Sequence, residues 1–148
     1  MSLKENNLRK ILDDIITSLG KNHIKKIIIL NGHHGNLQAL NRIGMEGVSK
    51  LSYWHFMKHE FDHAGFVETS LMLAISNKVK MKKAKKGLIT KELSEKEKKR
   101  ISKLSTKAGG FPKVTKNGVW GDPTGATKKD GQRFLSEIVR NLAKECQS

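Results

Sequence analysis

The apolar positions of the first third of the chain predict a helix followed by a strand. Between residues 5 and 20 they recur at the i, i+3, i+4 spacing of one helical face, and Gly20 follows as a stop. These positions are Leu8, Ile11, Leu12, Ile15, Ile16 and Leu19. The run Ile27-Ile28-Ile29-Leu30 shows no alternation and therefore suits a strand at about 25–30 that is covered on both faces, as in a parallel sheet.

The rest of the pattern predicts one more strand and four more helices. The strand is Leu51 to Phe56, parallel to the first through a right-handed crossover, and the helices lie at about 36–49, 65–76, 94–105 and 127–145. Ser94 begins the third of these helices with Glu97 at the capping-box position, and Thr127 is a good N-cap for the last. The order of elements predicts an α/β fold.

A polar loop follows the first predicted strand. It reads Asn31-Gly32-His33-His34-Gly35-Asn36, and its glycines allow a turn with positive φ and close approach of a ligand. Because ligands of parallel sheets bind where loops leave the carboxyl ends of strands, His33 and His34 stand where chemistry is usually done. On the residues alone, however, a histidine in a polar loop is more often a surface or capping residue than a metal ligand.

Composition limits the class of protein. A chain of 148 residues with 36% hydrophobic content suits one domain with a modest core, residues 1–148. There is no signal-peptide pattern and no run of about 18 apolar residues, so we expect a cytoplasmic protein without a membrane partner. The single cysteine, Cys146, cannot form an intrachain disulfide.

The net charge of +15 is concentrated in one segment. Residues 78–107 hold thirteen Lys or Arg against three Glu, without an aromatic residue for base stacking. We interpret this segment as a solvated basic insertion, and the alternative is nonspecific contact with a polyanion such as nucleic acid.

Three ordered segments resemble the creatininase (creatinine amidohydrolase) family. The loop Asn31 to Asn36 is similar to the family signature Asn-Gly-His-Gly-Gly-Asn, with His34 where most members have glycine. His63-Ala64-Gly65-Phe66-Val67-Glu68-Thr69-Ser70 and the segment Gly118 to Thr127, which contains Gly121-Asp122-Pro123, resemble the family in the same order. The resemblance covers the C-terminal part of the family domain, and implies a three-layer α/β/α domain with a mostly parallel sheet that is N-terminally incomplete.

The resemblance also implies chemistry. Members are metal-dependent hydrolases of amide-type, non-peptide C–N bonds, so His33 is expected as a metal ligand and Glu68 as a ligand or as the base that activates bound water. His63 is expected to transfer a proton as the tetrahedral intermediate collapses. A divalent metal is implied, zinc first, with manganese or iron as alternatives. Trp54 is expected in the core, and Asp122 receives no catalytic task.

The family's opening segment, which supplies a Glu-x-His pair and an Asp as metal ligands, has no counterpart in these residues. We therefore expect a truncated gene, a misplaced start or a first half supplied by a partner, with weak metal binding and little hydrolysis by the chain alone. Family members form homo-oligomers, and the implied substrates are creatinine, a formylamino-pyrimidine nucleotide or a peptide. The competing class is a noncatalytic basic module that binds nucleic acid or a partner chain.

Overall fold

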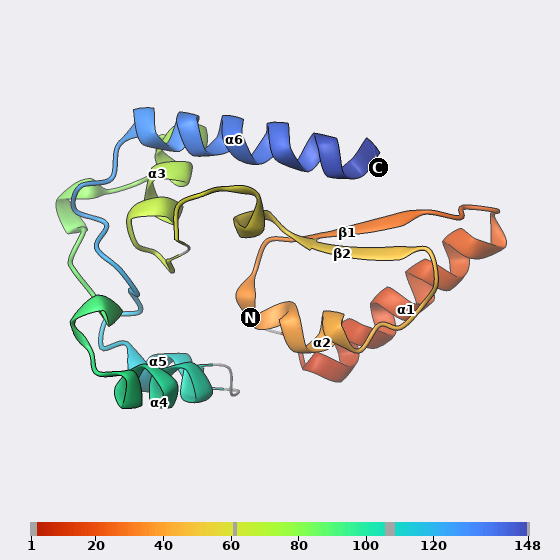
Figure 1. Cartoon of the computed structure of the whole chain (residues 1–148), viewed down its shortest axis with the longest axis horizontal. Helices are drawn as coiled ribbons and strands as arrows, with labels where there is room; N and C mark the ends of the chain where they lie inside the picture. Colours follow the sequence, from red (N-terminus) through yellow and green to blue (C-terminus); the bar gives the residue numbers. More distant parts are fainter. Residues whose placement is uncertain (1–2, 61, 106–108, 148) are drawn as a thin grey trace. The chain divides into compact units, whose positions relative to one another are not determined.

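The computed structural model of the chain describes residues 3–60, 62–105 and 109–147 (Figure 1). It forms two compact units, one that runs to His55 and includes the last residues from Glu145, and one that spans Phe56–Lys144. The single domain with a basic insertion at about 78–107 stays a prediction.

The first unit contains a parallel two-stranded sheet and its crossover. Its elements are α1 (Glu5–Lys21), β1 (Ile27–Asn31), the 3-10 turn η1 (His34–Asn36), α2 (Leu37–Asn41) and β2 (Val48–Ser52), with η2 (Tyr53–Phe56) after it. The register pairs Ile27 with Val48 and Asn31 with Ser52. The predicted α/β class, the first helix and the parallel pair of strands are confirmed.

Two predicted boundaries in this unit are wrong. The helix expected at 36–49 ends at Asn41, and the second strand begins at Val48 instead of Leu51. The cause is the turn at Gly47, which has φ +75°, and where a Cβ atom would collide with the carbonyl oxygen of Lys25. The Gly47 carbonyl accepts the N–H of Ile27 at 2.9 Å, so this turn also sets where β1 and β2 start to pair.

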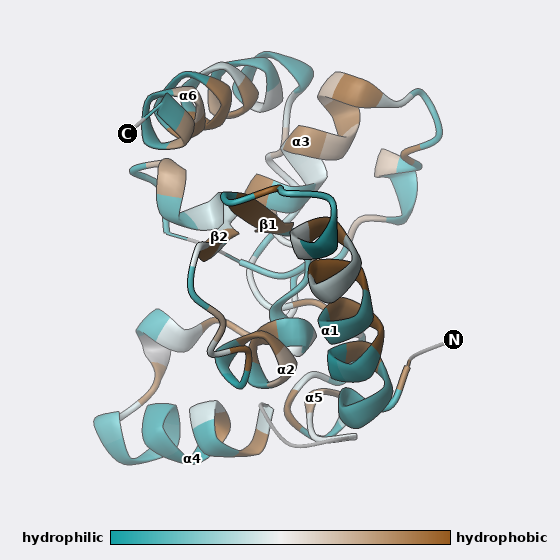
Figure 2. Ribbon diagram, turned by 90° about the vertical axis from the view of Figure 1, so that its right-hand side faces the viewer, coloured by the Kyte–Doolittle hydropathy of each residue, from teal (hydrophilic) through white to brown (hydrophobic). Residues whose placement is uncertain are grey.

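The core of the first unit lies between the helices and one face of the sheet. Ile16 of α1, Leu40 of α2 and Ile43 form a buried cluster, and the side chains packed against it are Leu12, Ile27, Ile29 and Val48. Figure 2 shows the matching amphipathic character of α1. Leu30 is 53% exposed, so the predicted cover on both faces of β1 is not found within this unit. Trp54 is buried, as predicted.

The second unit is built on two helices and a set of short backbone bridges. Its helical elements are α3 (Phe66–Ile75), η3 (Met81–Lys83), η4 (Thr90–Glu92), α4 (Glu95–Ser105), α5 (Phe111–Val114) and α6 (Lys128–Gln147). The rings of Phe66 and Phe134 join α3 to α6 in an edge-to-face contact with centroids 5.9 Å apart. Trp120 pairs through its backbone with His63 and with Leu88, which ties the loop before α3 to two later segments.

Both predicted helix caps are confirmed. The Ser94 hydroxyl accepts the N–H of Glu97 at 3.4 Å, and the Glu97 carboxylate accepts the N–H of Ser94 at 3.0 Å. At the start of α6 the Thr127 hydroxyl accepts the N–H of Asp130 at 3.0 Å.

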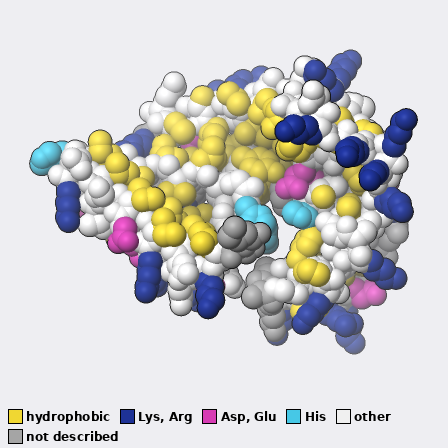
Figure 3. Space-filling view, turned by 180° about the vertical axis from the view of Figure 1, so that it is seen from behind, with side chains coloured by type: hydrophobic (Ala, Val, Ile, Leu, Met, Phe, Trp, Pro, Cys, Tyr) yellow, Lys and Arg dark blue, Asp and Glu magenta, His cyan; other side chains and the backbone are white. Residues whose placement is uncertain are grey.

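The basic segment is exposed but not detached. Among its described residues, 78–105, none whose side chain is described is buried, while residues 106 and 107 lie outside the described residues. Leu88 nevertheless donates its N–H to Val119 at 2.9 Å and accepts that of Gly121 at 2.8 Å. Figure 3 shows many Lys and Arg side chains (dark blue) and few Asp and Glu (magenta) on the face in view. Within the part of the chain that the structure describes, no helix is long and apolar enough to cross a membrane.

The close approach of α6 to α3 gives a first prediction. A Cβ atom at Gly131 would collide with the Ser70 carbonyl oxygen, so Gly131→Ala is expected to destabilise the chain by about 1–3 kcal/mol, as overpacking does. Gly125→Ala is the matched control, because no atom lies within 4 Å of its Cβ position, and should change stability by less than about 0.5 kcal/mol. Urea unfolding measures both, and equal effects would contradict the proposed packing.

Candidate active site

Asn31 organises the polar loop that follows β1. Its side chain is buried, with 3% exposure. The amide oxygen accepts the N–H of His33 at 3.1 Å and the side-chain N–H of Asn36 at 3.3 Å, while its nitrogen donates to the Ser52 hydroxyl at 3.3 Å. Because a buried amide needs partners for both its donor and its acceptor, these bonds fix the loop to the ends of both strands.

His33 is exposed and lies over the second glycine of the loop. A Cβ atom at Gly35 would stand 2.6 Å from His33 Nε2, so glycine leaves the room that the imidazole takes. His34 points elsewhere, with its ring 6.1 Å from that of Trp54. The loop therefore separates the two histidines, and His33 keeps the position that the sequence gave to the metal ligand.

The second loop brings His63 and Glu68 together. Glu68 Oε2 lies 3.5 Å from His63 Nδ1 and accepts the N–H of Ala64 at 2.7 Å. The side chains of His63 and Glu68 are 36% and 26% exposed, so both are within reach of a bound molecule. Phe111 supports the imidazole, with its ring edge-on to that of His63 at a centroid distance of 4.5 Å.

Asp62 stands at the start of α3. One carboxylate oxygen accepts the N–H of Val67 at 2.9 Å and the other accepts that of Glu68 at 3.3 Å. Burial raises the pKa of the Asp62 carboxyl above its ordinary value and outweighs these two N–H groups, which lower it. The charge of Glu68 also raises the pKa of Asp62, and that of His59 lowers it.

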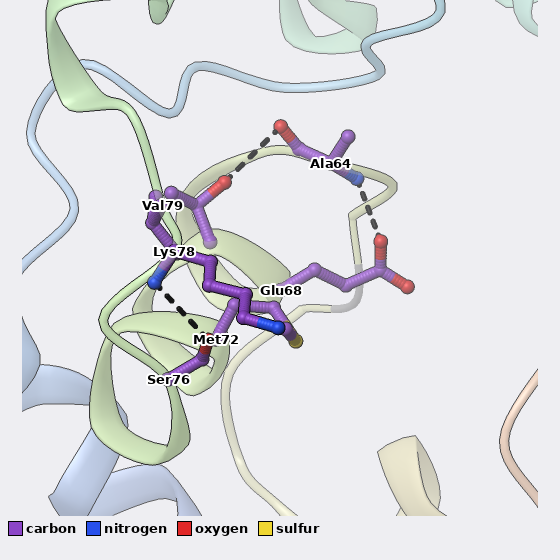
Figure 4. Close-up of a pocket in the computed structure, with 7 residues that line it drawn as sticks. Ala64, Glu68, Met72, Ser76, Lys78 and Val79 are labelled. Carbon is purple, nitrogen blue, oxygen red and sulfur yellow. Dashed lines mark hydrogen bonds between the residues drawn. The ribbon is translucent and has the colours of Figure 1, made fainter.

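A pocket opens beside Glu68. Figure 4 shows its lining, which comes from α3 and from the segment that follows it, and it has a volume of ≈ 290 Å³. Ala64 and Glu68 form one side, while Met72 and Val79 supply apolar wall and Lys78 crosses the view. A carboxylate and a histidine at the edge of a partly apolar pocket can hold a small organic group and move a proton on it.

The structure therefore joins two of the three predicted site residues. His63 and Glu68 share one loop of the second unit, and His33 belongs to the first unit. Their convergence on one pocket stays a prediction. Among the described residues, no group of three or more His, Cys, Asp or Glu side chains is placed to hold a metal ion.

Sequence reasoning missed the parts of the site that act through the backbone. Asp62 was noted only as a titratable group, although an Asp shortly before a helix start is a usual source of capping. The role of Asn31 in holding its loop was also not predicted. Ala64 has φ +50°, which no sequence pattern indicates, because alanine rarely adopts it.

The fold and these two loops describe an α/β protein with the groups of a hydrolase. Residues 1–146 match the sequence profile of the Creatininase family, creatinine amidohydrolase. The chain belongs to this family, as its three motifs predicted.

Individual relatives agree. The chain is 33% identical over 122 residues to a mycofactocin precursor peptide peptidase of Mycobacterium ulcerans, covering 77% of this chain and 45% of the relative. It is 29% identical over 102 residues to a creatinine amidohydrolase of Pseudomonas putida, covering 50% of this chain and 39% of the relative. The chain thus spans about half or less of the length of these relatives.

Solved structures show the same fold. A manganese form of creatininase has a TM-score of 0.69 at 22% identity, over 98% of this chain and 64% of that chain. A creatininase variant of Zn-Zn type has a TM-score of 0.68 at 22% identity, over the same shares. The predicted creatininase-like α/β fold is confirmed.

The glycines of the first loop give a second prediction. Gly35→Ala is expected to displace the His33 imidazole, because the new Cβ atom would lie 2.6 Å from its Nε2. Gly32→Ala is the control, since its Cβ position has no atom within 4 Å. The ring resonances of His33 in a 1H–13C spectrum should move in the first variant only. Equal movement in both variants would show that the imidazole does not occupy this position.

Proposed function

We propose that the chain carries part of the active site of a metal-dependent hydrolase of amide-type C–N bonds. The observation that carries this is the His63–Glu68 pair beside an open pocket, in a chain that belongs to an amidohydrolase family. Glu68 acts as a metal ligand or as the base for the attacking water, and His63 gives the proton that the leaving nitrogen needs.

The contacts of the pair suit these roles. The Ala64 N–H and the His63 ring both face Glu68 Oε2, which fixes one oxygen and leaves the direction of the carboxylate defined. Proton transfer requires a group within hydrogen-bond reach of the reacting atom, and the partial exposure of both side chains allows that approach. The apolar wall of Met72 and Val79 would receive the part of the substrate beside the bond that breaks.

The metal donors present are of the right kinds but too few. An imidazole at His33 and a carboxylate at Glu68 suit zinc or manganese, the metals of the neighbouring creatininase structures, and iron stays a further prediction. A bound ion of this type lowers the pKa of its water to about 7 and polarises a carbonyl. Since no group of three donors occurs among the described residues, the remaining ligands have to come from other polypeptide.

The relatives narrow the bond but not the substrate. One is named as a peptide peptidase and another as a creatinine amidohydrolase, and both names describe cleavage at an amide-type nitrogen. We propose an amide of small size as the substrate, and the restriction to non-peptide bonds stays a prediction. A homo-oligomer in the cytoplasm is likewise the expected state.

The third prediction concerns metal and activity. The chain alone should retain little zinc, manganese or iron and hydrolyse amides poorly, whereas a version extended with the family segment that bears Glu-x-His should gain both. In the extended version, His33→Ala should reduce bound metal, and Glu68→Gln should lower kcat roughly 10²–10⁴-fold by removing the base. Metal analysis after purification and hydrolysis of N-formyl and N-acetyl compounds are the measurements.

Two variants serve as controls for that experiment. His34→Ala removes the neighbouring histidine, and Glu60→Gln removes an exposed carboxylate before the same loop; neither should change metal content or kcat. Stoichiometric metal and hydrolysis by the 148-residue chain, both abolished by His33→Ala, would show that the ligand count is wrong. His34, His59 and Asp62 would then be the substitute ligands to test.

A second candidate function is polyanion binding by the basic segment. The exposure of 78–105 favours it, because α4 packs against α5 while its lysines stay on the surface. Such a surface would attract nucleic acid without reading its sequence.

The fourth prediction tests this surface with charge-matched variants. Lys96, Lys99 and Arg100 changed together to Gln should reduce the slope of log K against log salt for duplex DNA by roughly 2, because fewer counterions are released. Lys10, Lys21 and Lys25 changed to Gln lose the same charge in the first unit and should leave the slope nearly unchanged. Affinity that is insensitive to salt, or equal losses in both variants, would exclude a site on α4.

A further inference from the structure

We infer that Asp62 is a positioning residue for Glu68: its carboxylate holds the first turn of α3 against residues 63–65, so that Glu68 lies beside His63. The inference rests on the proposed function for its catalytic meaning. Its structural content does not, because the contacts described below exist without substrate or metal.

The first turn of α3 has no cap from its own N-cap residue. That residue is Gly65, which has no side chain to accept a hydrogen bond, and Asp62 supplies the acceptors instead, at 2.9 Å from the N–H of Val67 and 3.3 Å from that of Glu68. The bond to the Glu68 N–H fixes the backbone from which the Glu68 side chain extends. Asp62 therefore acts on the proposed base directly through its main chain.

The loop is shaped around the Asp62 carboxylate. A Cβ atom at Gly65 would collide with Asp62 Oδ2, and one at Gly121 would lie 3.1 Å from Asp62 Cβ. Ala64 is held at φ +50°, a conformation that an alanine keeps only where its neighbours enforce it. Its N–H reaches Glu68 Oε2 at 2.7 Å and its carbonyl accepts the Thr69 hydroxyl at 3.3 Å, so the loop closes on α3 from both sides of Asp62.

The amide proton of Ala64 reports on this arrangement. A short hydrogen bond to a carboxylate moves an amide proton downfield, and only the correct placement of Glu68 provides that bond. Glu68→Gln supplies the reference position of the Ala64 resonance without the carboxylate. A loss of helix capping alone, elsewhere in the chain, would leave this resonance where it is.

The experiment compares Asp62→Ala with Ser94→Ala by amide spectra of the full chain. Ser94→Ala removes the cap of α4 and should lower the melting temperature without moving the Ala64 proton. Asp62→Ala should move that proton upfield, toward its position in Glu68→Gln. If Asp62→Ala does not fold, Asp62→Asn decides, because it keeps one acceptor and should move the proton part of the way. An Ala64 proton at its wild-type position in the folded Asp62 variant overturns the inference.

The extended, metal-loaded hydrolase provides the catalytic readout. Asp62→Ala should lower kcat roughly 10–100-fold, as loss of an outer partner of a metal ligand does, with KM little changed. If the Ala64 proton moves but kcat does not, the positioning is real and the proposed role of Glu68 is wrong. If neither changes, the inference about Asp62 itself fails.

Discussion

The hydrogen bond from the Ala64 N–H to the Glu68 carboxylate, at 2.7 Å, is the contact on which the candidate site depends. It sets one oxygen of Glu68 at 3.5 Å from His63 and holds the loop in a left-handed turn at Ala64. An exposed ion pair of this kind contributes little stability, because solvent screens it. Its value is geometric, since it fixes a titratable carboxylate beside an imidazole at the edge of a pocket.

The helices could be predicted from the sequence because their signals are local. The apolar stripe of α1, the box formed by Ser94 and Glu97, and the cap at Thr127 all lie within a few residues of the elements that they define. The second strand could not be bounded in this way. Gly47 ends the preceding segment through a contact with Lys25, more than twenty residues earlier, and no periodicity records such a contact.

The site residues were predicted from motifs, whereas the groups that hold them were not. His33, His63 and Glu68 are chemically distinctive side chains, so a motif identifies them. Asn31 and Asp62 act by accepting backbone N–H groups, and many Asn and Asp residues near turns do so. Only the structure shows that these two carry the loops of the site.

The two loops share one construction, which has a consequence for the split of the site between units. In each, one carboxamide or carboxylate accepts N–H groups from residues two to six positions later, and a glycine leaves the space for it or for the side chain that it orients. Backbone N–H groups away from water need acceptors, and here the loop itself supplies them. Each unit therefore fixes its own share of the site residues through local bonds. His33 and the His63–Glu68 pair are ordered before any ligand or further polypeptide joins them, which reduces the ordering cost of assembling a complete site.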